Sequence, residues 1–180
     1  DNTVALNEIF EDAFGAVLWI KENIAKYKGD NTKIAVTGDS AGAHLSAMIV
    51  NSGRALSSND KYEESLKFNP TWLPHNTTPE QVAEADGLAV QAAILSYGAF
   101  NIYQGSLDGF ETFKNPFWLV TGSRARGVFG NQYNAEINQN MYQAVSPTYN
   151  IPKQTEQALP PQYFIVGSED NLTTPASVKE

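Results

Sequence analysis

The residues Gly38-Asp39-Ser40-Ala41-Gly42 fit the pattern G-x-S-x-G. This pattern is typical of a sharp turn between a strand and a helix that lifts a serine hydroxyl clear of a sheet. Such a hydroxyl can attack a carbonyl carbon and form an acyl intermediate once a base removes its proton. The pattern therefore predicts Ser40 as a nucleophile, held in a strained backbone conformation. Glycine at positions 38 and 42 would let the strand and the helix pass closely.

The residue after the serine has a second chemical role in this arrangement. A helix that begins beside Ser40 directs unpaired backbone N–H groups and the positive end of its dipole toward the serine. We therefore expect the N–H of Ala41 to stabilise the oxyanion that forms when the carbonyl is attacked. The alternative is a glycine-rich turn that carries an incidental serine.

A carboxylate that could orient the base follows a later apolar run. The sequence Val166-Gly167-Ser168-Glu169-Asp170 ends just beyond a predicted strand, and ligands gather at this edge of open α/β sheets. We expect Asp170 to be the acid, with Glu169 as its nearest rival. The alternative role of Asp170 is to cap the turn before a helix that begins near Thr174.

The base is not evident among the two histidines of the chain. Both precede Asp170, whereas the α/β-hydrolase order is serine, acid, histidine. His44 lies four residues after Ser40 on the same predicted helix, where a packed core residue is the expected interpretation. His75 lies in a polar loop and is expected to be a solvated surface residue. The base is therefore missing from the expected position, and His44 remains the less favoured candidate for it within the sequence.

The elements that must position these residues alternate between helix and strand. Apolar residues three or four apart predict an amphipathic helix over 3–27, capped by Asn2 and ended by Gly29. Its apolar stripe consists of Leu6, Ile9, Ala13, Val17, Ile20, Ile24 and Tyr27. The apolar run 33–37 predicts a strand buried on both faces, and helical spacing returns over 41–50. This alternation predicts an α/β fold with a parallel sheet.

The rest of the chain is less regular. Residues 51–86 are polar and interrupted by proline, which predicts a surface loop with a short helix near 79–85. Two further strands are predicted over 90–96 and 162–166, adjacent to the first in one sheet. The segment 98–150 carries 10 of the chain's 20 aromatic residues at irregular spacing and suggests a lid-like insertion. Its aromatic side chains would either wall an apolar pocket or pack within the lid. The candidates for such a wall include Phe113, Phe117, Trp118 and Phe129.

Composition excludes several classes of function. With 12 Lys and Arg against 20 Asp and Glu, the net charge of -8 disfavours nucleic acid and anionic lipid headgroups as partners. Without cysteine there is no disulfide and no thiolate ligand or nucleophile, so a cytoplasmic and a secreted soluble protein fit equally. The longest apolar stretches are far shorter than the roughly 20 residues that span a bilayer. Serine chemistry needs no metal ion and no organic cofactor, so neither is expected.

Taken together, these motifs resemble the carboxylesterases of the α/β-hydrolase fold, in particular the hormone-sensitive-lipase-like and carboxylesterase type B branches. The motifs that carry the resemblance are residues 16–25, 29–30, 34–42 and 166–170. The resemblance is close over residues 3–50 and about 160–180, and loose over 51–159. It implies a mostly parallel central sheet flanked by helices, with Ser40 as nucleophile, Asp170 as acid and Ala41 at the oxyanion hole.

The resemblance also implies parts that residues 1–180 do not contain. A glycine-rich oxyanion segment would precede residue 1, and the catalytic histidine would follow residue 180. We therefore expect 1–180 to be the central part of one α/β-hydrolase domain, whose exposed sheet edges are covered by a complementary polypeptide segment or second chain.

The function that the resemblance implies is hydrolysis of a small-molecule carboxylic ester through an acyl-enzyme. A serine peptidase or acyl-peptide hydrolase of the same fold is one alternative. A non-catalytic binding module or an inert fragment is another, because one fold hosts many functions.

Overall fold

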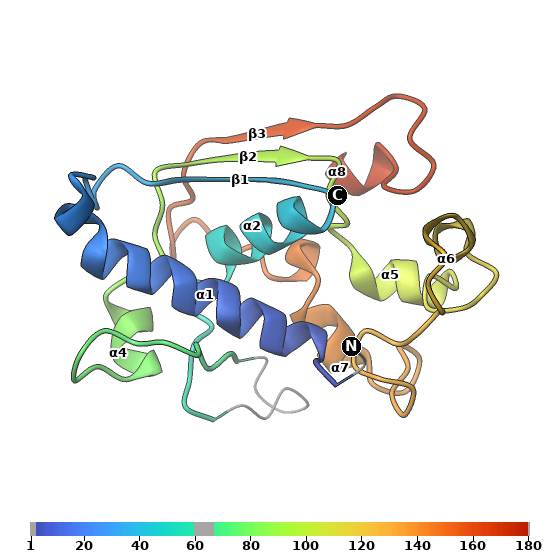
Figure 1. Ribbon diagram of the computed structural model, residues 1–180, viewed down its shortest axis with the longest axis horizontal. Coiled ribbons are helices and arrows are strands. Elements are labelled where there is room, and N and C mark those ends of the chain that lie inside the picture. The colour runs from blue at the N-terminus through green and yellow to red at the C-terminus, as the bar shows by residue number, and fades with distance from the viewer. Residues whose placement is uncertain (1–2, 60–66, 180) are drawn as a thin grey trace.

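The computed structural model describes residues 3–59 and 67–179. Its centre is a parallel sheet with the strand order β1-β2-β3. The strands are β1 (Ala35–Asp39), β2 (Ala92–Ser96) and β3 (Gln162–Ile165). Figure 1 shows the helices α1 (Leu6–Asn23) and α2 (Ala41–Asn51) on one side of these strands. The predicted α/β class, the parallel sheet and the adjacency of the three strands are confirmed.

Short helices make up most of the remaining regular structure. They are η1 (Ile24–Tyr27), α4 (Pro79–Glu84), α5 (Ile102–Leu107), α6 (Pro116–Thr121), α7 (Gln139–Ala144), η2 (Pro147–Tyr149) and α8 (Ala176–Lys179). The short helix predicted near 79–85 is therefore confirmed as α4. Its start has the capping box that its sequence favours, because the Thr78 hydroxyl accepts from Gln81 N–H while the Gln81 side chain accepts from Thr78 N–H.

The predicted N-terminal helix is present, but its buried face differs from the predicted stripe. The buried apolar residues are Phe10, Phe14, Val17 and Leu18, whereas Ile9, Ile20 and Tyr27 are exposed. The helix has apolar residues on two faces, and the face with the two phenylalanine rings packs toward α2. The cap predicted at Asn2 lies outside the described residues, and Ala5 is the N-cap.

The end of this helical region also differs from the prediction in one detail. The left-handed residue is Lys28, with φ 66°, rather than Gly29. At position 29 a Cβ would lie 2.3 Å from Cγ1 of Ile24, so a larger residue there would force the Ile24 side chain to move. The predicted end of the helical region is thus in the right place, and the left-handed residue at this end is Lys28.

Strand β1 is not buried on both faces as its apolar run predicts. Ala35, Thr37 and Asp39 are exposed, and only the alternate residues turn toward α2. Of the described helices, only α2 packs extensively on the strands, and it covers one face of the sheet. The opposite face carries exposed apolar side chains at Ile94 and Tyr163. The prediction is therefore wrong for the described residues, since nothing among them covers this face.

The segment 51–86 is not only a surface loop. Phe68 is fully buried, and its ring meets those of Phe10 and Phe14 edge-on at centroid distances of 6.0 Å and 5.5 Å. An isolated bridge pairs Phe68 with Leu56, which is also buried. Edge-to-face aromatic pairs of this kind add stability beyond the buried area. Because the segment is mostly polar, its composition does not indicate that Phe68 packs into the core against α1.

Candidate functional site

Ser40 occupies the turn between β1 and α2, which follow each other directly (Figure 1). Its backbone has φ 53° and ψ -118°, a conformation that non-glycine residues rarely adopt. The N–H of Ser40 donates to the carbonyl oxygen of Ser96 at 2.9 Å, and its own carbonyl accepts from the N–H of His44 at 3.2 Å. The side chain is exposed. The predicted strained strand-to-helix turn that presents a serine is therefore present.

The two glycines of the motif have different surroundings. A Cβ at Gly38 would lie 2.2 Å from both the carbonyl carbon and the carbonyl oxygen of Gly42, so only glycine fits at position 38. A Cβ at Gly42 would meet no atom within 4 Å. The predicted close approach of strand and helix is confirmed at Gly38. At position 42 a side chain would have space among the described residues, and the close contact there involves only the main chain of Gly42, which lies against Gly38.

We expect Gly38→Ala to lower the free energy of unfolding by about 3 kcal/mol, because the added methyl group overlaps main-chain atoms that cannot rotate away. Gly42→Ala is the matched control, since it adds the same group to open space and favours the helix by up to about 1 kcal/mol. Urea unfolding of both variants measures the difference. Equal stability of the two variants would contradict the packing described for the turn.

Ala41 begins α2 and is exposed beside the serine. Among the described residues its N–H has no hydrogen-bond partner, as is usual for the first N–H groups of a helix. The 11-residue helix also directs the positive end of its dipole at this point. The arrangement can donate a hydrogen bond to a developing oxyanion near Ser40.

Asp170 lies in the turn that follows β3, at the same carboxyl edge of the sheet as Ser40. Its Oδ1 accepts from the N–H groups of Leu172 and Thr173, both at 2.9 Å, and its Oδ2 accepts from the Thr173 hydroxyl at 2.8 Å. These hydrogen bonds, the Thr173 N–H first, lower the pKa of Asp170 below its ordinary value. The carboxylate is thus fixed and ionised, and it caps the turn as the alternative interpretation expects.

His44 is a core residue, as its place in the sequence suggests. Its ring is 4% exposed and meets Phe10 edge-on at a centroid distance of 5.1 Å. Its Nε2 lies 2.7 Å from the carbonyl oxygen of Val145, and since a carbonyl only accepts, Nε2 carries the proton. Burial lowers the pKa of His44 to about 4. His75 is exposed, as expected, and the structure brings neither histidine to Ser40 as a free base.

The buried His44 predicts a loss of stability in mild acid. Its pKa is about 4 in the folded chain and 6.5 in the unfolded chain, so only the unfolded chain binds a proton between these values. The contribution of His44 to the free energy of unfolding is therefore complete above pH 6.5 and decreases as the pH falls to 4. Between pH 7 and pH 4.5 the wild type should lose on the order of 2 kcal/mol more of its free energy of unfolding than His44→Gln, measured by urea unfolding. An equal loss in both proteins would remove His44 as the cause.

The aromatic side chains of 98–150 mainly pack against one another. Phe110, Phe117 and Trp118 form a cluster with ring centroids 5.2–5.8 Å apart. Phe129 is buried, and its ring meets that of Tyr142 at a centroid distance of 5.2 Å. This is the lid-packing alternative. Phe113, by contrast, is exposed.

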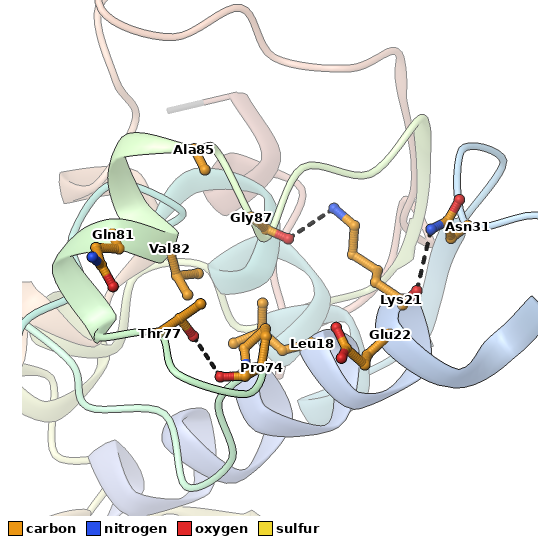
Figure 2. A pocket seen from close by; sticks show the side chains of 10 residues that line it. All are labelled: Leu18, Lys21, Glu22, Asn31, Pro74, Thr77, Gln81, Val82, Ala85 and Gly87. Carbon is orange, nitrogen blue, oxygen red and sulfur yellow. Dashed lines mark hydrogen bonds between the residues drawn. The ribbon is translucent and has the colours of Figure 1, made fainter.

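Two cavities of the described residues lie away from Ser40. Figure 2 shows a cavity of about 270 Å³ between α1, α4 and the loop at Pro74, where Lys21 Nζ donates to the carbonyl oxygen of Gly87 at 2.7 Å. The helix α4, which lines this cavity, lies toward the amino ends of the strands (Figure 1). A second cavity, of about 370 Å³, is lined by Glu111, whose pKa is raised by burial. Ser40 and Asp170 line neither cavity.

Residues 3–59 and 67–179 contain neither a cluster of metal-binding side chains nor a membrane-spanning helix. No group of three or more His, Cys, Asp or Glu side chains there could hold a metal ion. No helix in the same ranges is long and apolar enough to cross a bilayer.

Tyr97, at the carboxyl end of β2, is a residue that sequence reasoning missed. It has φ 42°, and its N–H donates to the carbonyl oxygen of Ile165 at 2.6 Å. Its neighbour Ser96 accepts the hydrogen bond from Ser40, so Tyr97 lies beside the serine turn. A tyrosine followed by glycine directly after a buried strand was the available signal.

Known proteins resemble the chain in sequence and in structure. Esterase LipQ of Mycobacterium tuberculosis is 30% identical over 166 residues, which are 92% of this chain and 31% of LipQ. Carboxylesterase NlhH of the same species is 38% identical over 64 residues, which are 36% of this chain and 18% of NlhH. A truncated form of a carbohydrate esterase from gut microbiota has a TM-score of 0.61 at 18% identity, covering 94% of this chain and 52% of that chain.

A thermophilic esterase of Thermogutta terrifontis has a TM-score of 0.55 at 20% identity, covering 98% of this chain and 48% of that chain. These structural likenesses confirm the predicted α/β-hydrolase fold. The chain spans about a third of the length of LipQ and about half the length of the solved structures. Residues 3–179 match the sequence profile of the family described as BD-FAE. The chain therefore belongs to the BD-FAE family.

Proposed function

We propose that the protein containing this chain is a carboxylic ester hydrolase that acts through an acyl-enzyme on Ser40. The observation that carries the proposal is the exposed serine in a strained turn between a parallel strand and the start of a helix. A backbone outlier of this kind persists only where the surrounding structure enforces it, and such outliers cluster at active sites. The naming of the relatives as esterases supports the same conclusion.

The chemistry assigns a role to each residue at this edge of the sheet. Ser40 Oγ attacks the carbonyl carbon of the ester while a base takes its proton, and the N–H of Ala41 holds the oxyanion. The bond from the carbonyl carbon to the alcohol oxygen then breaks, and the base returns the proton to the leaving alcohol. Water hydrolyses the acyl group from Ser40 by the reverse sequence of proton transfers.

Asp170 is the residue that we assign to orient the base. Its carboxylate is negatively charged at neutral pH, as a carboxylate that stabilises an imidazolium must be, and the hydrogen bonds that lower its pKa favour this charged form further. The bonds from the Thr173 and Leu172 N–H groups fix its position and leave acceptor capacity on its oxygens. The base itself is a histidine supplied by polypeptide outside residues 1–180.

The same outside polypeptide completes the fold in this proposal. The sheet face that α2 does not cover carries Ile94 and Tyr163 at 44% and 65% exposure, more apolar surface than a finished sheet leaves to water. We assign residues 1–180 to the central part of one α/β-hydrolase domain. Residues 98–150 form its lid-like insertion, since α5 and α6 lie beyond the carboxyl ends of the strands (Figure 1).

The substrate class is a small-molecule ester rather than an amide. Full-length protein should hydrolyse p-nitrophenyl acetate, and should leave p-nitroacetanilide, which has the same acyl group in an amide, unchanged. Hydrolysis of the anilide at a comparable kcat/KM would identify a peptidase or acyl-peptide hydrolase of the same fold. Binding of an ester without turnover would identify a binding module.

A further inference from the structure

Tyr97 shares its unusual backbone conformation with Ser40. Positive φ values among the described non-glycine residues occur at Lys28, Ser40, Asn76, Asp86 and Tyr97. Asn and Asp adopt this region comparatively often, whereas a bulky ring makes it a true outlier. Such an outlier points to a function at the place where it occurs.

The register of the sheet places Tyr97 next to the proposed nucleophile. Asp39 of β1 pairs with Ser96 of β2, so Ser40 and Tyr97 each follow one member of the same pair. Neighbouring strands are about 4.8 Å apart, which makes the two residues immediate neighbours at the carboxyl edge. On its other side, Tyr97 N–H donates to Ile165 of β3 at 2.6 Å. Tyr97 therefore stands between the strand that ends at Ser40 and the strand that leads to Asp170.

The turn after Tyr97 is built tightly against α2. A Cβ at Gly98 would lie 2.5 Å from the ring of Phe100 and 2.9 Å from Cβ of Ala43. This close passage fixes the main chain on the C-terminal side of Tyr97. Tyr97 itself stays 39% exposed. The main chain thus holds Tyr97 at the edge of the sheet, and part of its surface remains accessible to a ligand.

The direction of proton transfer indicates which part of the substrate lies on this side. In the proposed mechanism, the base that Asp170 orients returns a proton to the alcohol oxygen, so we expect the leaving alcohol on the β3 side of Ser40. Tyr97 occupies that side. We infer that Tyr97 is a specificity-determining residue whose ring contacts the leaving alcohol and limits its size.

This inference rests on the proposed function, and two pairs of esters test it in full-length protein. Phenyl acetate and 2-naphthyl acetate differ in the alcohol, whereas phenyl acetate and phenyl hexanoate differ in the acyl group. Tyr97→Gly removes the ring and suits the left-handed backbone. We expect it to raise the naphthyl-to-phenyl ratio of kcat/KM about tenfold, at the low end of the discrimination that even one methylene gives in an apolar pocket. The hexanoate-to-acetate ratio should stay within twofold.

Tyr97→Phe is the matched control, because it keeps the ring and should leave both ratios within twofold. Tyr97→Asn replaces Tyr97→Gly if the glycine variant does not fold, since asparagine tolerates the same backbone region. A purely structural role would lower kcat/KM for all esters together and leave the alcohol ratio unmoved, which would overturn the inference. A shift of the acyl ratio instead would also overturn it. Absence of ester turnover in the wild type would overturn the proposed function itself.

Discussion

Ser40→Ala is expected to lower kcat/KM for p-nitrophenyl acetate by about 10⁵-fold in full-length protein, which in practice abolishes turnover. Without Oγ no acyl-enzyme can form, and the oxyanion donor and the binding site alone retain little catalysis. Alanine keeps the Cβ of serine, and the Ser40 main-chain bonds to Ser96 and His44 do not involve the hydroxyl. The fold should therefore be intact, with an unchanged circular dichroism spectrum and a melting temperature close to that of the wild type.

Ser46→Ala is the control for the loss of a serine from α2. Ser46 is buried on the same helix, away from the turn at Ser40. Its replacement should leave kcat/KM within about threefold of the wild type. Turnover by Ser40→Ala within twofold of the wild type would remove Ser40 from the mechanism.

Asp170→Asn is expected to lower kcat/KM by about 10⁴-fold, because an amide cannot stabilise the imidazolium that forms in the transition state. Asparagine retains a carbonyl oxygen that can accept from the Leu172 and Thr173 N–H groups, so the turn after β3 should keep its shape. The measurement is kcat/KM of the full-length variant, with its melting temperature as a check on folding.

Glu169→Gln is the matched control at the neighbouring position. Glu169 is exposed one residue earlier in the same turn, and its replacement should change kcat/KM by less than about threefold. Severe loss in Glu169→Gln alone would move the acid by one residue. Near-normal activity of Asp170→Asn with a lowered melting temperature would leave Asp170 only its capping role.

The features that the sequence predicts correctly depend on local geometry. The strained turn at Ser40 follows from the spacing of Gly38 and Ser40 between a strand and a helix. The three strands are identified by short apolar runs, and their alternation with helices implies a parallel sheet. The surface position of His75 and the buried one of His44 also follow from their local sequence.

The features that it predicts wrongly depend on contacts between distant segments. The buried face of α1 is the one that packs on Phe68, through Phe10 and Phe14. Phe68 lies far along the chain in a polar segment. The apolar run of β1 implies cover on both faces, but the described residues cover only one. The conformation of Tyr97 depends on hydrogen bonding to β3 and on the close passage of Gly98 past α2. The partners in these contacts lie far apart in the sequence, so a short window does not identify them.

The central claim, that Ser40 is an activated nucleophile, is tested most directly by a fluorophosphonate probe. The probe forms a stable adduct only with a serine whose proton a working base removes. Intact mass and peptide mapping of full-length protein should show one adduct on Ser40, none in Ser40→Ala, and much slower labelling in Asp170→Asn. An unlabelled wild-type protein, or an adduct on a different serine, would contradict the assignment of the nucleophile to the turn between β1 and α2.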